Sequence, residues 1–202
     1  MNYRTSLMRL HHIINIKINW LTIMIKVFLI LAVLLTLIFI FKKSAFGSED
    51  VLLGKTAPEF KLKNSYGELI SLDQFKGEWL LVFFYPKDDT PGCTKEACSL
   101  RDNYNDIKKL NANVIGISID SSDSHKDFKE KYNLPFMLLS DPDGKTAKKY
   151  GALNNFFIFK LAKRQSFIID PEGTIRRVYR NVSPSNHAQE IKNDLEAFER
   201  NS

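Results

Sequence analysis

The stretch YPKDDTPGCTKEAC, residues 85–98, decides the fold. The run that leads into it, WLLVFFY at residues 79–85, is continuously apolar and rich in aromatic and branched side chains, which is typical of a central strand buried on both faces. Prolines and a glycine then interrupt the strand, and apolar residues recur at helical spacing over residues 94–110. Cys93 is therefore predicted to lie where a buried strand ends and a helix begins.

The only cysteines of the chain, Cys93 and Cys98, both lie in this stretch, five positions apart. A thiol at a helix N-terminus is expected to ionise readily, because the free backbone N–H groups and the helix dipole favour an anion, and the thiolate is the reactive form. On an intact helix this spacing would hold the two Cα atoms roughly 8 to 9 Å apart, beyond the ~7 Å limit for a disulfide. The pair can bridge only if the first helical turns unwind. The spacing favours a redox cycle, with two ordinary buried cysteines as the alternative.

Pro86, Thr90 and Cys93 form the pattern Pro-x-x-x-Thr-x-x-Cys, which resembles the active-site signature of the peroxiredoxins. The run GCTKEACSLRD, residues 92–102, resembles the Q-type (bacterioferritin comigratory protein-like) branch of the AhpC/TSA superfamily. The similarity covers about residues 53–198. It implies a thioredoxin-like fold and a thiol-specific peroxidase that acts on hydrogen peroxide and organic hydroperoxides.

The resemblance also implies a role for each residue of the predicted site. Cys93 is the expected peroxidatic nucleophile, which becomes a sulfenic acid, and Cys98 is the expected resolving thiol. The resulting Cys93–Cys98 disulfide would be reduced by thioredoxin or a similar dithiol, as in an atypical 2-Cys enzyme, with no cofactor and no metal. Thr90 and Arg164 are expected to bind the peroxide beside Cys93, and Pro86 to shield the thiolate. The alternatives are a hydroxyl bonded to its own turn for Thr90, strand termination for Pro86, and a solvated strand-end residue for Arg164.

The charge distribution separates an N-terminal segment from the rest of the 202-residue chain. The first 50 residues carry a net charge of +4 of the total of +6, so the remainder is close to neutral and offers no basic stripe for nucleic acid. Two cysteines at this spacing also argue against a disulfide scaffold and a four-thiolate zinc site. The predicted organisation is a basic tail at 1–19, a transmembrane or signal-anchor helix at 20–41, a linker at 42–51 and a thioredoxin-like domain at 52–202.

Residues 20–41 are apolar except for Thr22, Lys26 and Thr36, and about 20 such residues are needed to cross a membrane. We expect an uncleaved anchor with the domain outside the cytoplasm, in the periplasm. Export after signal cleavage near Gly47 and a domain that faces the cytoplasm are the alternatives. Translation from Met24 rather than Met1 also stays open.

The remaining pattern predicts an α/β fold, a three-layer α/β/α sandwich of the thioredoxin-like kind. The helix that ends at Tyr132 is expected to be capped by Ser124. His125 and His187 are expected at exposed helix starts, and neither supports a cysteine–histidine protease. The expected elements are a hairpin at 57–62 and 68–72, strands at 113–120 and 134–140, helices at 124–132 and before Gly151, a hairpin at 167–170 and 174–179, and a closing helix at 187–200.

Some features leave alternatives open. The apolar run at 154–162, with Phe156 and Phe159, is expected to be core, with a membrane-facing patch or a dimer contact as alternatives, and the chain is expected to be a monomer or else a dimer. Arg101 lies eight residues after Cys93, about 12 Å along a helix, so a structural role is expected. A membrane-tethered copper chaperone or thiol–disulfide oxidoreductase is the alternative function. The cysteine spacing argues against both. Copper chaperones of this kind have three residues between their cysteines and an oxidoreductase would need Cys-x-x-Cys, whereas four residues lie between Cys93 and Cys98.

Overall fold

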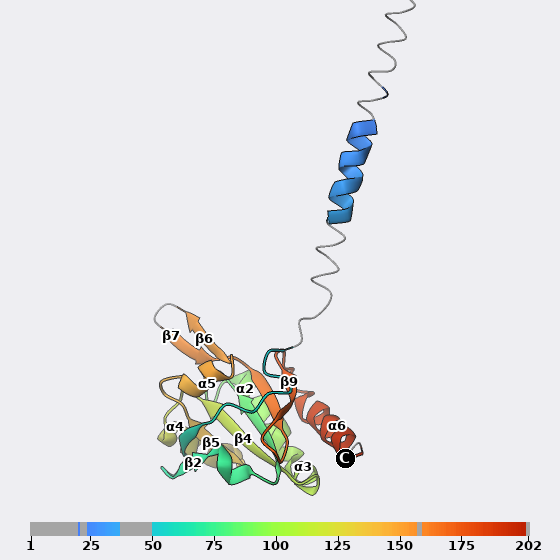
Figure 1. The fold of residues 1–202 in the computed structure, drawn as a ribbon. Helices are drawn as coiled ribbons and strands as arrows, with labels where there is room; N and C mark the ends of the chain where they lie inside the picture. Colours follow the sequence, from blue (N-terminus) through green and yellow to red (C-terminus); the bar gives the residue numbers. More distant parts are fainter. Residues whose placement is uncertain (1–19, 21–23, 37–49, 157–158, 201–202) are drawn as a thin grey trace, which may run out of the picture. The chain divides into compact units, whose positions relative to one another are not determined.

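The computed structural model describes residues 20, 24–36, 50–156 and 159–200, and the side chains of 155, 156 and 159 are not described (Figure 1). The chain divides into two units, Met1–Glu49 and Asp50–Ser202. In the first unit, residues 24–36 are helical.

Among the described residues, no helix is long and apolar enough to cross a membrane. The prediction of a membrane anchor at 20–41 is corrected by this finding, and so is the extracytoplasmic, membrane-anchored localisation that was inferred from it. The basic tail at 1–19 and the cleavage site predicted near Gly47 lie outside the described residues.

The second unit is built on a seven-stranded mixed sheet with the order β2-β1-β5-β4-β3-β8-β9. The three central strands β5, β4 and β3 run parallel to one another, and the flanking pairs are antiparallel. The strand bounds are β1 (Lys61–Asn64), β2 (Leu69–Ser71), β3 (Trp79–Phe84), β4 (Ala112–Ser118), β5 (Met137–Ser140), β8 (Gln165–Ile169) and β9 (Ile175–Tyr179). A separate hairpin, β6 (Leu153–Phe156) and β7 (Phe159–Ala162), contains the apolar run at 154–162 that was expected to be core. Its Ala162 is buried and its Leu161 is exposed, and the side chains of Phe156 and Phe159 lie outside the described set.

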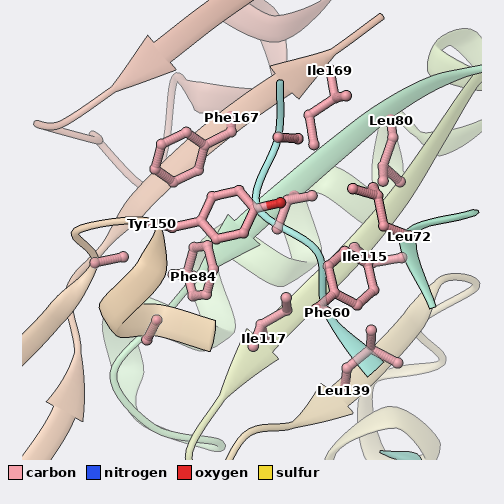
Figure 2. Close-up of a cluster of buried hydrophobic side chains, with 14 of the residues drawn as sticks. Phe60, Leu72, Leu80, Phe84, Ile115, Ile117, Leu139, Tyr150, Phe167 and Ile169 are labelled. Atoms are coloured by element: carbon pink, nitrogen blue, oxygen red, sulfur yellow. The ribbon is translucent and has the colours of Figure 1, made fainter. Parts of the chain in front are cut away.

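The central strand β3 is buried on both faces, as its sequence predicts. Leu80, Val82 and Phe84 belong to one hydrophobic cluster, whereas Leu81 and Phe83 belong to the other. Figure 2 shows the first cluster, in which the rings of Phe84, Tyr150 and Phe167 pack against one another with centroids 5.0 to 5.9 Å apart. The sheet therefore has a tightly packed layer on each side.

Helices cover one face of this sheet, and short elements cover the other. The cluster on the helical face takes residues from α2 (Pro91–Asp102), α3 (Tyr104–Lys109), α4 (Ser122–Tyr132) and α6 (His187–Arg200). The opposite cluster takes residues from the 3₁₀ turn η1 (Leu72–Phe75), the short helix α5 (Lys145–Lys149) and the segment before β1. The α/β architecture predicted from the alternation of strands and helices is confirmed.

Two local predictions differ from the structure. The helix expected over 94–110 begins earlier and is divided at Asn103, whose side chain donates to the Ser99 carbonyl at 2.9 Å and so ends α2. The cap of α4 is Ser121 rather than Ser124, because the Ser121 hydroxyl accepts from the Ser124 backbone N–H at 3.2 Å. The Ser124 side chain instead turns inward, which matters for the site.

Candidate active site

Cys93 lies in the first turn of α2, immediately beyond the C-terminal end of β3. Pro91 occupies the first helical position, where its missing N–H costs nothing, and Thr90 is the extended N-cap residue. The first intrahelical bond runs from the Thr94 N–H to the Thr90 carbonyl at 2.8 Å. Cys93 is only 2 % exposed. The thiol is therefore held at the positive end of a helix dipole and shielded from bulk water.

Arg164 reaches this thiol from a distant part of the sequence. β8 pairs antiparallel with β3 so that Gln165 lies opposite Phe84, which places Arg164 beside the end of β3. Its Nη2 donates to the Cys93 sulfur at 3.3 Å. A guanidinium in this position stabilises negative charge on the sulfur. The structure thus brings together the predicted nucleophile and the predicted cation.

The approach of this guanidinium depends on Gly92. A Cβ atom at that position would lie 3.1 Å from Arg164 Nη2, a distance tighter than most real Cβ contacts. Glycine is therefore needed at this position because it allows Arg164 to approach the start of α2 closely, and not because the backbone adopts an unusual angle there.

Glu96 belongs to the candidate site, although the sequence analysis did not identify it. Its side chain is fully buried, and Oε2 accepts a short charge-assisted hydrogen bond from Arg164 Nη1. Burial raises the pKa of Glu96 to about 7, and the guanidinium of Arg164 only partly opposes this. The available signal was its position three residues after Cys93, which puts both side chains on one face of α2. Arg164 is therefore shared between the thiol and a buried carboxyl group.

Thr90 and Pro86 lie in the connection between β3 and α2, and both are half-buried. The Thr90 hydroxyl donates to the Lys87 carbonyl at 3.0 Å, which is the bond within its own turn that the sequence left as the alternative. The proton of this hydroxyl is therefore engaged, and its oxygen retains lone pairs that can accept.

Cys98 lies five residues, about 1.4 turns, further along α2 and is half-buried. Neither cysteine forms a disulfide, and α2 is continuous between them. The helical rise of about 7.5 Å between the two residues therefore applies, and a bridge requires the first turns to unwind. Buried Ala97 and Leu100 and the ion pair of Glu96 oppose that unwinding.

A buried polar network centred on Asp88 fixes the segment before Cys93. The Asp88 carboxylate accepts from the Tyr85 hydroxyl at 2.7 Å and from the Ser124 hydroxyl at 2.7 Å, and His125 Nδ1 lies 2.8 Å from it. Burial, followed by the charge of Asp88, raises the pKa of Tyr85 well above its ordinary value. The network ties the loop to the first turn of α4.

The prediction that His125 and His187 are exposed is wrong, because both are fully buried. A helix start is exposed only when it faces solvent, and these two face polar partners inside the fold. His187 Nε2 lies 2.8 Å from the Ser166 hydroxyl, and burial is the main cause that lowers the pKa of His187 to about 4, with Arg164 contributing. Within the part of the chain that the structure describes, no group of three or more His, Cys, Asp or Glu side chains could hold a metal ion.

Comparison with known proteins gives a consistent result. The model of the AhpC/TSA family matches residues 53–178. A chloroplastic peroxiredoxin Q from Sedum lineare is 45% identical over 149 residues, which cover 73% of this chain and 80% of the relative. A putative peroxiredoxin bcp from Coxiella burnetii is 46% identical over 146 residues, which cover 70% of this chain and 97% of the relative.

Solved structures agree with these relatives. The peroxidoxin BcpB of Mycobacterium tuberculosis superposes with a TM-score of 0.68 at 31% identity, over 72% of this chain and 96% of that protein. A cysteine-to-serine mutant of PrxQ from Xylella fastidiosa superposes with a TM-score of 0.70 at 29% identity, over 75% of this chain and 99% of that protein.

Proposed function

The chain belongs to the AhpC/TSA family, and from this membership we propose that it reduces hydrogen peroxide and organic hydroperoxides at Cys93. Its relatives are named peroxiredoxin Q or bcp, which supports a thiol peroxidase. The observation that carries the proposal is the 3.3 Å contact between Arg164 Nη2 and the sulfur of Cys93 at a buried helix N-terminus. The copper chaperone and the thiol–disulfide oxidoreductase are not favoured, because the relatives are peroxiredoxins.

In the first step, the thiolate of Cys93 attacks one oxygen of the peroxide. The S–O bond forms, the O–O bond breaks, and the leaving oxygen takes up a proton to become water or an alcohol. Arg164 stabilises the thiolate and then the charge that develops on the two oxygens. The Thr90 hydroxyl donates a hydrogen bond to the Lys87 backbone carbonyl, so its oxygen is oriented to accept a hydrogen bond from the peroxide O–H. Pro86 shields the sulfur from solvent and offers no competing donor.

In the second step, the first turns of α2 unwind and Cys98 condenses with the sulfenic acid. The S–S bond forms, the S–O bond breaks, and the oxygen leaves as water. An external dithiol such as thioredoxin then reduces the disulfide, returning two thiols and becoming a disulfide itself. The two free cysteines on one helix support this assignment.

The test is a single turnover of the reduced full-length chain with one equivalent of hydrogen peroxide, followed by thiol alkylation and mass spectrometry. We expect both thiols to disappear and the chain to lose two hydrogen atoms. Cys93→Ser should abolish peroxide consumption, whereas Cys98→Ser should consume one equivalent and stop at the sulfenic acid.

The arginine is tested by its rate effect. Arg164→Met should slow the first step by about 100-fold, the loss typical of removing one group that stabilises developing charge. Arg176→Met, at an exposed arginine of β9, is the matched control and should leave the rate unchanged. Peroxide consumption by Cys93→Ser at the wild-type rate contradicts the proposal. The electron donor is tested by measuring peroxide turnover with and without thioredoxin and its reductase. We expect sustained turnover only when both are present.

A further inference from the structure

Arg101 lies on α2 three residues after Cys98, and none of the steps above uses it. Side chains at this spacing are neighbours on a helix surface, with Cβ atoms about 5 to 6 Å apart. Arg101 is too far along the helix to serve Cys93, which is why the sequence suggested only a structural role. Arg101 is close enough to act on Cys98 instead, and Cys98 must also react as a thiolate.

The guanidinium of Arg101 is held in a fixed place. Nη1 donates to the Tyr132 carbonyl at the end of α4 at 2.8 Å, and Nε donates to Asp102 at 2.9 Å. Its side chain is 33% exposed, so the charge is partly shielded from solvent. This bond joins α2 to α4 through two residues that are 31 positions apart in sequence. The part of α2 that follows Cys98 is thereby fastened to α4, while the turns before it are those that must unwind.

The electrostatic environment of Cys98 supports a direct effect of this cation. The pKa of Arg101 is raised, first by the hydrogen bond to Asp102 and also by the charge of Cys98, so the guanidinium lies within electrostatic reach of that sulfur. Other charged groups on α2 near Cys98 in sequence are Lys95, Asp102 and the buried Glu96. The elements beside α2 also carry charge: Lys131 on α4 pairs with Asp89, and Lys192 on α6 pairs with Asp106. Asp102 offsets part of the Arg101 charge but is itself 62% exposed.

We propose that Arg101 is the positioning residue of the resolving step: its cation favours the thiolate of Cys98, and its bond to Tyr132 holds that sulfur in place while Cys93 moves toward it. This inference rests on the proposed function, since it needs Cys93 to be oxidised by peroxide. The thiolate of Cys98 attacks the sulfenic sulfur of Cys93. The S–S bond forms, and the hydroxide that leaves takes a proton from solvent to become water.

The experiment separates the two chemical steps in the full-length chain. Formation of the sulfenic acid is followed in a Cys98→Ser background after one equivalent of hydrogen peroxide, and formation of the disulfide is followed with both cysteines present by rapid alkylation and mass analysis. Arg101→Met should leave the first step within twofold of its parent. It should slow the second by about five- to tenfold at pH 7, the effect of losing a partly screened cation near a thiol.

The pH profile distinguishes an electrostatic role from a purely structural one. The deficit of Arg101→Met should shrink toward pH 9.5, where a thiol ionises without help, and Arg101→Lys should recover most of the rate at pH 7. Lys148→Met, at an exposed cation of α5 on the opposite face of the sheet, is the matched control and should resolve as fast as the wild type.

A wild-type rate in Arg101→Met at pH 7, or a deficit of the same size at pH 7 and pH 9.5, overturns the inference. Failure of the wild type to lose the Cys93 thiol on addition of peroxide would instead overturn the proposed function, so the two failures are distinguishable.

Discussion

The buried carboxyl group of Glu96 makes a prediction about stability that can be worked out from the structure. Glu96→Gln replaces the carboxyl group by a neutral amide of nearly the same shape, and so resembles the protonated form of the residue. Burial raises the pKa of Glu96 from the ordinary 4.5 to about 7 in the folded protein despite its contact with Arg164. The stability of the variant relative to its parent should therefore rise between pH 4.5 and about 7 and stay constant at higher pH, where the parent carries a buried negative charge.

The direction follows from the protons that each state binds. Below pH 4.5 the carboxyl group is protonated in both the folded and the unfolded state. As the pH rises toward 7, the unfolded chain loses this proton while the folded chain keeps it, so the free energy of unfolding falls. The contribution of the neutral acid is fully present below pH 4.5 and is lost once the pH has passed through about 7. One pKa unit corresponds to about 1.4 kcal/mol, so the loss is about 3 kcal/mol at most.

The assay is urea unfolding at pH 5 and at pH 8.5. Parent and variant both carry Cys93→Ser, so that no thiol at position 93 contributes to the titration. Glu96→Gln should gain about 2 to 3 kcal/mol relative to its parent between the two pH values, whatever the offset at pH 5. Glu130→Gln, at an exposed carboxyl group on α4, is the control and should show no such gain.

A stability difference between Glu96→Gln and its parent that is the same at both pH values refutes the reasoning, as does a larger loss for the variant at pH 8.5. Either result would mean that the ion pair with Arg164 outweighs the cost of burying the charge.

Three further predictions follow from the same site. Gly92→Ala places a Cβ atom 3.1 Å from Arg164 Nη2 and should slow the reaction with peroxide about tenfold by displacing the guanidinium, which stopped-flow kinetics can measure; an unchanged rate contradicts this. Asp88→Ala removes the buried carboxylate that Tyr85, Ser124 and His125 share and should reduce the free energy of urea unfolding by about 2 to 4 kcal/mol; a loss below 1 kcal/mol would show that the network contributes little. The depressed pKa of His187, about 4 against an ordinary 6.5, contributes stability that is fully present above pH 6.5 and is lost as the pH falls through about 4. His187→Gln should therefore lose less stability than the wild type between pH 7 and pH 4 in thermal unfolding, and parallel curves would argue against it.

Local sequence determined the central features of the site and of the core. The continuous apolar run at 79–85 was enough to predict a strand buried on both faces, because such a run has no polar face to expose to water. The prolines and the glycine after it placed the start of α2 within three residues of its observed position at Pro91, and with it the environment of Cys93, because caps and helix termini depend on a few adjacent residues. The spacing of the two cysteines implied the need for unwinding, because helical rise is the same in every protein.

The prediction of a membrane anchor at 20–41 came from apolar composition, which is a local property of the sequence. Among the described residues, no helix is long and apolar enough to cross a membrane. Periodicity also failed to predict that the expected helix at 94–110 is divided. A side-chain hydrogen bond from Asn103 to the Ser99 carbonyl ends α2 where periodicity alone would continue it.

What only the tertiary structure decided is which distant groups share a buried space. Arg164 is 71 residues from Cys93, and it reaches the sulfur because the register of β8 against β3 places Gln165 opposite Phe84. Whether Glu96 and the two histidines are buried depended likewise on partners supplied by other elements, since a polar group leaves water only where something replaces its hydrogen bonds. The sequence thus determined the proposed nucleophile and its helix, and the long-range pairing of strands determined the electrostatic environment around its sulfur.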